Sequence, residues 1–158
     1  MGAADALRQA VAGDTVRYVV NRNINYTNIC TYRCSFCAFS KGKTHEALRG
    51  PAYDLDHAEI IRRAREAWAR GATEVCLQGG IHPDLGLEYY EELLRALKSA
   101  LPGVHLHAYS PMEIHSLCRK SGLDPRTVLG RLRDAGLGSV PGTAAEILDD
   151  AMRDQPSP

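Results

Sequence analysis

The chain has 158 residues, 24% of them charged and 44% hydrophobic, and its nineteen basic residues balance nineteen acidic ones. A net charge of zero gives no overall field that would attract nucleic acid or an anionic membrane surface, so neither is expected as a partner. No stretch approaches the roughly 20 apolar residues of a membrane span. Composition predicts one core-forming domain.

Short β-like runs alternate with helical patterns along the chain. After a polar amphipathic opening at residues 3–12, the β-like runs cover residues 16–26, 74–78, 104–109 and 137–140. The last three are separated by about thirty residues, the size of a βαβ unit. This spacing predicts an α/β fold with a parallel sheet.

Helix signals fill the gaps between these runs. Capping boxes are expected at Asp56/Glu59, Ser110/Glu113 and Thr143/Glu146, and helix ends at Gly71 and Gly136. Apolar stripes with helical spacing predict two core faces, formed by Ile61, Ala64 and Trp68 in one helix and by Tyr90, Leu93, Leu94 and Leu97 in the next.

Alternation within the strands separates an apolar face from a polar one. The predicted apolar face, toward the helices, holds Ile24, Tyr26, Val75, Leu77, Val104, Leu106 and Ala108. The predicted polar face holds Asn21, Asn23, Asn25, Cys76, Gln78, His105, His107 and Tyr109. One polar face favours a barrel with a polar lumen, because an open doubly wound sheet buries both faces.

Residues that could bind a ligand or take part in a reaction follow each of the predicted strands. The first strand leads into a cysteine loop, the second into Gln78-Gly79-Gly80, the third into residues 110–113 and the fourth into residues 141–143. Active sites of parallel βα folds lie at the carboxyl ends of the strands. We therefore expect these four loops to meet on one face of the fold.

Three cysteines have the spacing Cys30-x-x-x-Cys34-x-x-Cys37. Three thiolates can converge on one metal centre, one fewer than normally close an iron–sulfur cluster or a structural zinc site, so a position stays open for a ligand. A catalytic zinc with three protein ligands and a water is a competing interpretation, and buried inert thiols are another. The odd total of five cysteines disfavours disulfides and favours a cytoplasmic protein.

The cysteine motif and the residues before it, NRNINYTNIC at residues 21–30, resemble the radical S-adenosylmethionine (SAM) superfamily. Three further blocks, at residues 71–83, 109–114 and 141–150, narrow the resemblance. Within the superfamily, roughly residues 5–150 are similar to the tyrosine-cleaving 4-hydroxyphenyl transferases of deazaflavin (F-zero) synthase, in coenzyme F-420 biosynthesis. The fold implied is the α/β radical SAM (β/α)8 barrel.

This resemblance implies that Cys30, Cys34 and Cys37 bind three irons of a 4Fe-4S cluster and that S-adenosyl-L-methionine chelates the fourth. An electron from a donor such as ferredoxin or flavodoxin then cleaves the sulfonium, and the 5′-deoxyadenosyl radical takes a hydrogen from L-tyrosine. The 4-hydroxybenzyl fragment adds to 5-amino-6-(D-ribitylamino)uracil. A second F-zero synthase subunit or domain closes the deazaflavin ring.

Single positions are interpreted in the same way, although no catalytic side chain is assigned. Phe36 would pack near the adenine or serve as an apolar loop anchor. Gln78, Gly79 and Gly80 would bind the methionyl amino group, since glycine lets backbone groups approach a ligand, or would form a plain turn after the strand.

Other polar residues receive structural interpretations first. Glu113 is expected to cap a helix before it contacts a cofactor. His105 and His107 are expected to be hydrogen-bonded lumen residues, with substrate contact as the alternative. Cys76 and Cys118 are too distant in sequence from the motif to be assigned as ligands.

The chain is short for a complete barrel, which takes about 250 residues. We expect residues 1–158 to form a partial barrel of about four βα units, truncated at the C-terminus as a fragment or by a broken gene, and inactive alone. The alternatives are a futalosine-pathway radical SAM enzyme of menaquinone biosynthesis, a catalytically dead cluster-binding remnant and, as a minor option, a zinc-dependent hydrolase.

Overall fold

The computed structural model describes residues 2–32, 34, 37, 51–142 and 149–153. Its centre is a parallel sheet of three strands in the order β1 (Asn21–Asn25), β2 (Glu74–Gln78) and β3 (His105–Ala108). Asn21 lies opposite Glu74, and Glu74 lies opposite His105, so the three strands begin at one level. The predicted parallel α/β fold is confirmed.

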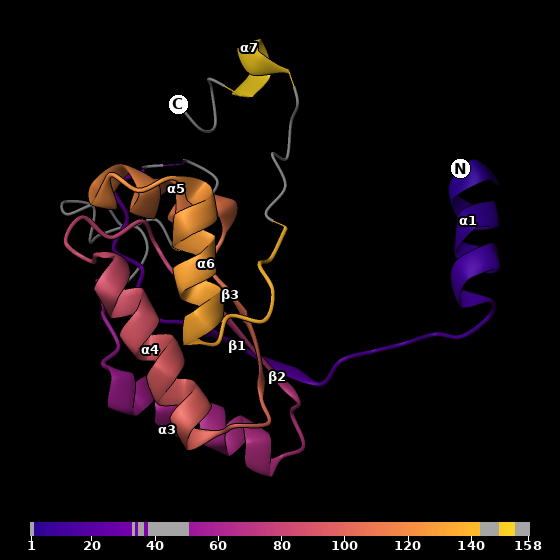
Figure 1. Ribbon diagram of the computed structural model, residues 1–158, viewed down its shortest axis with the longest axis horizontal. Helices are drawn as coiled ribbons and strands as arrows, with labels where there is room; N and C mark the ends of the chain where they lie inside the picture. Colours follow the sequence, from indigo (N-terminus) through magenta and orange to yellow (C-terminus); the bar gives the residue numbers. More distant parts are fainter. Residues whose placement is uncertain (1, 33, 35–36, 38–50, 143–148, 154–158) are drawn as a thin grey trace.

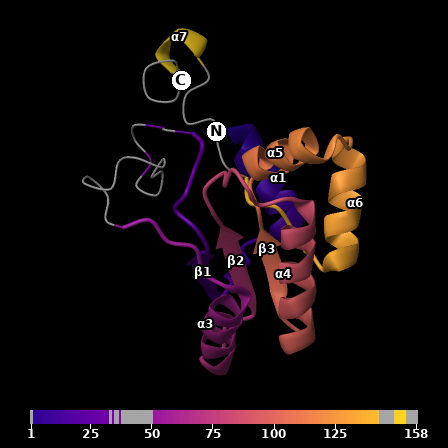
Figure 2. The same cartoon turned by 90° about the vertical axis from the view of Figure 1, so that its left-hand side faces the viewer.

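The helices lie mainly along one face of this sheet (Figures 1 and 2). They are α1 (Gly2–Ala12), α3 (His57–Ala69), α4 (Leu87–Ala100), α5 (Pro111–Ser121), α6 (Pro125–Ala135) and α7 (Asp150–Arg153). Figure 1 shows α5 across the end of the strands and α6 returning beside α4, whereas α1 stands apart from the sheet and has no buried residue. Among the described residues, no helix has the length and apolar character needed to cross a membrane.

The core lies between the sheet and α3, α4 and α6. Alternation in the strands is confirmed for Val75, Leu77, Leu106 and Ala108, all at most 1% exposed. The predicted stripe of α4 is also confirmed, because its four members are at most 3% exposed. These two faces pack against each other and exclude water, the main source of folding free energy.

The stripe predicted for α3 is wrong at its end. Ile60, Ala64 and Ala67 form the buried face, whereas Trp68 is 41% exposed. Its indole lies over the backbone of Gly103, where a Cβ would come within 3.0 Å of the ring. The helix buries the face that carries its alanines because it packs closely against both β1 and α4, and this orientation leaves Trp68 at the edge of the interface.

The first strand is shorter than predicted. Residues 16–20 lie outside β1, and Val16 and Tyr18 are 88% and 85% exposed. The physical reason is the lack of a partner: β2 begins at Glu74, the residue paired with Asn21, so no strand continues alongside the earlier residues. A β-branched composition alone does not make a strand without a neighbour to bond.

The end of the third strand departs from the predicted alternation. Tyr109 was expected on the polar face, but it is fully buried and has a φ of 62°. This left-handed conformation turns the side chain to the helix side, where its hydroxyl donates a hydrogen bond to the Tyr90 carbonyl at 2.9 Å. The strand therefore ends at Ala108.

The predicted fourth strand is confirmed in position and wrong in length. Ser139 forms an isolated parallel bridge with His107, and the Gly138 N–H donates to the Leu106 carbonyl at 2.9 Å. Residues 137–140 form no regular strand. Three strands and one bridge are what the described residues contribute to a barrel-like sheet.

The helix caps follow the sequence in most cases. Ser110 and Glu113 form the complete predicted capping box at the start of α5. At α3, Asp56 accepts from the Glu59 N–H, but Glu59 itself pairs with arginines of its own helix, so this box is only half formed. Gly71 and Gly136 adopt positive φ after α3 and α6, as predicted. The third predicted box lies outside the described residues.

Candidate functional site

The cysteine loop begins directly after β1 and is closed at its base by a neck, formed by residues 27–28 and 51–54. The side chain of Asn28 donates to the Pro51 carbonyl at 3.0 Å and accepts from the Tyr53 N–H at 2.8 Å. Thr27 donates its hydroxyl to the Tyr53 carbonyl at 3.0 Å. Thr27 and Asn28 are at most 5% exposed, so these polar bonds are shielded from water and hold both ends of the loop together.

The glycine turn after β2 supports the other side of the loop. The Gly80 N–H donates to the Thr27 carbonyl at 3.0 Å, and the Thr31 N–H donates to the Ile81 carbonyl at 2.9 Å. A Cβ at Gly80 would lie 2.1 Å from the Ile29 carbonyl oxygen, so only glycine permits this approach. The close contact made by this turn is therefore with the cysteine loop itself.

Gly79 has a similar contact with a different partner. A Cβ there would lie 2.4 Å from Cζ of Tyr26, the residue that follows β1. Gln78 ends β2 opposite Asn25 and is half-buried on the polar face of the sheet. The three residues predicted to bind a cofactor thus lie at the carboxyl end of β2, beside the cysteines, as expected.

The three cysteines of the motif are half-buried. The Ile81 N–H donates to Cys30 Sγ at 3.3 Å, and the Cys37 N–H donates to the Cys34 carbonyl at 3.2 Å. Burial raises the pKa of the Cys30 thiol, and the charges of Cys37 and Cys34 raise it further. Three cysteine sulfurs are the soft donors that iron–sulfur clusters and zinc take, and a backbone N–H donates to one of them. Phe36 lies outside the described residues.

A buried carboxylate joins the ends of the three strands. Glu113, 1% exposed, accepts a hydrogen bond from the Tyr26 hydroxyl after β1, from the Gly79 N–H after β2 and from the Ser110 N–H after β3, the last at 2.6 Å. We call this set of contacts the Glu113 junction. Burial raises the pKa of Glu113, and burial together with the Glu113 charge raises the pKa of Tyr26.

The sequence predicted the capping role of Glu113 correctly and missed its wider contacts. The hydroxyl of Tyr26 also lies 3.2 Å from that of Tyr90, and the ring of Tyr109 stacks edge-on against both tyrosines. The available signal was the presence of Tyr26 and Tyr90 at predicted core positions, because a buried phenol needs a hydrogen-bond partner. The Glu113 junction thus holds Tyr26, just before the cysteine loop, and Gly79, in the turn that contacts this loop.

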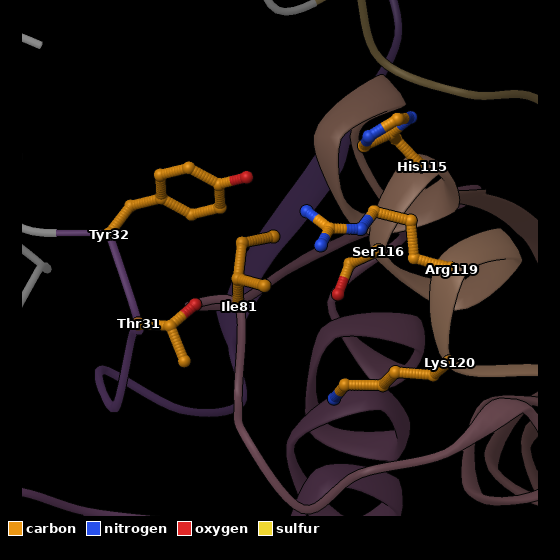
Figure 3. A pocket seen from close by; sticks show the side chains of 7 residues that line it. All are labelled: Thr31, Tyr32, Ile81, His115, Ser116, Arg119 and Lys120. Carbon is orange, nitrogen blue, oxygen red and sulfur yellow. The ribbon is translucent and has the colours of Figure 1, made fainter. Parts of the chain in front are cut away.

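A basic pocket of about 300 Å³ adjoins the cysteine loop (Figure 3). Thr31, Tyr32 and Ile81 line one side, and the other side is formed by α5 through His115, Ser116, Arg119 and Lys120. Lys120 donates to the Leu85 carbonyl at 2.8 Å, which fixes its position. This pocket was not predicted, although the adjacent basic residues Arg119 and Lys120 were a signal for it in the sequence.

The remaining predicted positions lie away from the cysteine motif. Cys76 lies in the middle of β2 on the polar face, and Cys118 lies on α5. His105 and His107 lie on β3, and both share hydrogen-bond contacts with Ser139. The predicted hydrogen bonding of these histidines is confirmed, whereas His105 is exposed and is therefore not a core residue.

The sequence of this chain is similar to those of several known proteins. The chain is 50% identical over 155 residues to the 5-amino-6-(D-ribitylamino)uracil–L-tyrosine 4-hydroxyphenyl transferase of Trichormus variabilis, covering 95% of this chain and 39% of that protein. It is 54% identical over 152 residues to the FO synthase of Mycobacterium leprae, covering 95% and 17%. The chain therefore spans about two fifths or less of the curated relatives described here.

Solved structures agree on the fold. The FeFe-hydrogenase maturase HydG aligns with a TM-score of 0.54 at 14% identity, over 88% of this chain and 37% of its own. Methylornithine synthase (PylB) aligns with a TM-score of 0.51 at 19% identity, over 86% and 47%. At these identities the likeness concerns the fold alone.

The family assignment combines the two kinds of observation. A cysteine loop is held between the ends of β1 and β2, and the sequence profile of the radical SAM superfamily matches residues 24–154, which include this loop and all three strand ends. The chain belongs to the radical SAM superfamily.

Proposed function

We propose that this chain is the cluster-binding portion of a 5-amino-6-(D-ribitylamino)uracil–L-tyrosine 4-hydroxyphenyl transferase, an enzyme of F-zero and coenzyme F-420 biosynthesis. The observation that carries the proposal is the cysteine loop: it is held by the neck and by the glycine turn, and one of its sulfurs accepts a backbone N–H. The transferase and FO synthase names of relatives at 50% and 54% identity support the substrate class.

Cys30, Cys34 and Cys37 are proposed as the ligands of a 4Fe-4S cluster that also binds S-adenosyl-L-methionine. When bound, such a cluster supplies the electron that starts radical chemistry. The chain's contribution is to hold the thiolates in place and to stabilise their charge. The Ile81 N–H at Cys30 Sγ does both, because hydrogen bonds from Ile81 and Tyr32 lower the pKa of that thiol against the effect of burial.

The loop environment also suggests where S-adenosyl-L-methionine would bind. Gln78 ends β2, and Gly79 and Gly80 follow it, with Gly80 next to Cys30 at the carboxyl end of the sheet, where ligands of parallel folds bind. We include Phe36 in the proposal as an adenine contact because it precedes Cys37 in the motif. Their contribution would be binding and orientation, not proton transfer.

The whole enzyme would act on L-tyrosine and 5-amino-6-(D-ribitylamino)uracil, receive electrons from ferredoxin or flavodoxin and pass its product to a second F-zero synthase subunit or domain. The cytoplasmic location is proposed from the cysteine pattern. The names of the relatives favour this reaction over the futalosine-pathway alternative.

The cluster assignment is tested by anaerobic reconstitution of the 158-residue chain. We expect about four irons and four sulfides per chain, with broad visible absorption. Cys34→Ala should prevent formation of the intact cluster. Cys76→Ala is the matched control and should retain it, because Cys76 lies on β2 away from the motif. A colourless protein with stoichiometric zinc would contradict the assignment.

The reaction is tested in a chimera that joins this chain to the remaining portion of the Trichormus variabilis transferase. With S-adenosyl-L-methionine and a strong reductant, it should convert both substrates to a 4-hydroxybenzyl adduct and form 5′-deoxyadenosine. Formation of 5′-deoxyadenosine only with a futalosine-type substrate would replace the proposal by the menaquinone alternative. The isolated chain should show no tyrosine cleavage, since it corresponds to 39% of that relative.

A further inference from the structure

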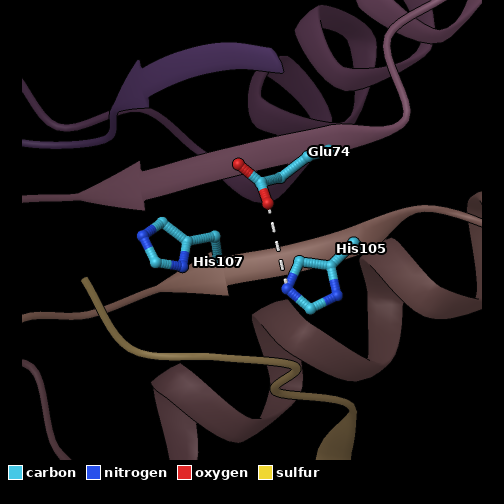
Figure 4. A group of neighbouring side chains, drawn as sticks. All are labelled: Glu74, His105 and His107. Atoms are coloured by element: carbon cyan, nitrogen blue, oxygen red, sulfur yellow. Dashed lines mark ion pairs between the residues drawn. The ribbon is translucent and has the colours of Figure 1, made fainter. Parts of the chain in front are cut away.

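A second group of metal-ligating side chains lies on the polar face of the sheet, at the amino ends of two strands (Figure 4). Glu74 begins β2, His105 begins β3, and the two are partners in the sheet register. His107 follows two residues later on the same face. One ligand atom from each of the three lies within 4.8 Å of the other two.

The two imidazoles are aimed at one point. Ser139 Oγ lies 2.8 Å from His105 Nε2 and 2.6 Å from His107 Nδ1. One hydroxyl contacts both nitrogens, so their hydrogen-bonding directions meet at this oxygen. Glu74 completes the group: Asn21 donates to its Oε1 at 3.4 Å, and its Oε2 faces His105 Nε2 at 3.9 Å.

The strands that carry the three side chains are ordered before any ligand binds, and one of the rings is packed against the backbone. A Cβ at Gly138 would lie 2.5 Å from His105 Cε1 and 2.7 Å from Nδ1, so the bare glycine backbone packs directly against the ring. Glu74, His105 and His107 stand on strands with regular hydrogen bonds on both sides of β2. Side chains ordered in this way lose little conformational entropy when they bind an ion.

Charge and access also favour a cation. The Glu74 side chain is only 15% exposed, and the ion pair found for it among the described residues is with His105, which is charged only when protonated. A bound metal ion would give this shielded carboxylate a permanent counter-charge. The His105 side chain is 47% exposed, so a hydrated ion can reach the group from solvent.

We propose that Glu74, His105 and His107 form a binding site for a divalent transition-metal ion, with Zn²⁺ as the best match. Two imidazoles and one carboxylate are a known zinc ligand set. Ser139 Oγ now lies at the point where both imidazoles are directed, so the Ser139 side chain would rotate to admit the ion. Tetrahedral zinc with bonds of about 2.0–2.1 Å separates its ligand atoms by about 3.3 Å. Donors within 4.8 Å of one another reach that arrangement by small side-chain rotations.

This site is separate from the cysteine loop. The loop follows the carboxyl end of β1, whereas Glu74 and His105 begin their strands, and the length of β2 puts roughly 13 Å between its two ends. The inference does not depend on the proposed function, because a zinc site on the sheet and a cluster in the loop can each exist without the other.

The test uses the full chain with Cys30, Cys34 and Cys37 replaced by Ser, which removes the competing thiolates. Zinc chloride is titrated into this protein by calorimetry, and we expect one equivalent to bind. X-ray absorption at the zinc edge should show nitrogen and oxygen ligands with the scattering pattern of two imidazoles. Sulfur scattering, which would indicate Cys76 or Cys118, would overturn the ligand assignment.

In the same background, His105→Ala, His107→Ala and Glu74→Gln should each weaken zinc binding by about 100-fold or more, since even outer-shell partners of metal ligands are worth 10–100-fold. His115→Ala, an exposed histidine on α5, is the matched control and should bind zinc unchanged. Circular dichroism identifies a variant that fails to fold, and Glu74→Gln preserves side-chain volume for that reason. Equal affinity in all four variants, or no binding by the parent protein, would refute the site.

Discussion

The Glu113 junction gives the most direct test of how the fold supports the cysteine loop. Replacing Glu113 by Ala removes both carboxylate oxygens and leaves the backbone N–H groups of Ser110 and Gly79 without this acceptor. The Tyr26 hydroxyl keeps Tyr90 as a second contact at 3.2 Å. The acceptor of two backbone N–H groups is therefore the main loss.

The expected destabilisation follows from these contacts. Each donor left unsatisfied costs about 1–3 kcal/mol, so the loss of two donors in Glu113→Ala should lower the free energy of unfolding by about 2–6 kcal/mol. For a chain of this size, that corresponds to a fall in melting temperature of about 4–24 °C. Glu113→Gln keeps the volume and one acceptor oxygen, and it should cost about 1–2 kcal/mol.

The pH dependence of stability distinguishes the effect of the Glu113 charge from the effect of its side-chain volume. Burial raises the pKa of Glu113 above its usual 4.5, so the folded protein holds this proton more tightly than the unfolded chain. Its stability contribution is fully present below pH 4.5 and is lost as the pH rises through the raised pKa. The stability difference between wild type and Glu113→Gln should therefore be larger at about pH 5 than at about pH 8.

Thermal unfolding by circular dichroism at both pH values measures these effects, and iron content after reconstitution reports on the loop. We expect Glu113→Ala to bind less iron even below its melting temperature, because Gly79 and Tyr26 no longer share an anchor. Replacing the exposed Glu88 by Ala is the control and should alter neither property. Unchanged stability and iron content in Glu113→Ala would refute the junction as a support of the site.

Two further predictions concern glycines. Gly80→Ala should sharply reduce cluster content while leaving helix content nearly unchanged, because its Cβ would lie 2.9 Å from Cβ of Cys30 and push the loop away; iron analysis and circular dichroism measure the two quantities. An alanine in the left-handed conformation costs about 1–2 kcal/mol. Gly136→Ala should destabilise the fold by more than this, since its Cβ would also lie 2.4 Å from Lys98 Cγ. Gly122→Ala, also at positive φ but in open space, should show only the conformational cost, and equal melting temperatures for the two variants would contradict the predicted clash.

The sequence was most informative where local chemistry and tertiary contacts agree. The limits of β2 were predicted correctly at Glu74 and Gln78. Apolar and polar residues alternate between them, and the apolar residues pack against the helices while the polar ones lie on the opposite face of the sheet. The capping box at Ser110 was also predicted correctly, because its two hydrogen bonds involve only residues that are close in sequence.

Predictions failed where distant contacts decide the outcome. Tyr109 left the expected alternation because one positive φ turns it toward Tyr90, and no pattern in the strand indicates that conformation. Trp68 was placed in the core by its spacing, but the inward rotation of α3 depends on how its small residues meet β1 and α4. Both errors arise from packing between elements.

The candidate site was predicted in the same uneven way. The spacing of Cys30, Cys34 and Cys37 indicated a metal centre, and the rule for strand ends placed Gly79 and Gly80 beside it. The neck and the Glu113 junction were not predicted, because their partners lie up to 87 residues apart in the chain. Spacing within a motif is visible in a sequence, whereas the scaffold of that motif is distributed over several elements.

The span of the Glu113 junction also sets an order of events during protein synthesis. Tyr26 emerges from the ribosome long before Glu113, and the two are 87 residues apart. The cysteine loop, although made early, gains its full support only when the third strand and the start of α5 have been added. A cluster inserted before that stage would occupy a loop that lacks these contacts, so we expect stable metal loading only after the third βα unit is complete.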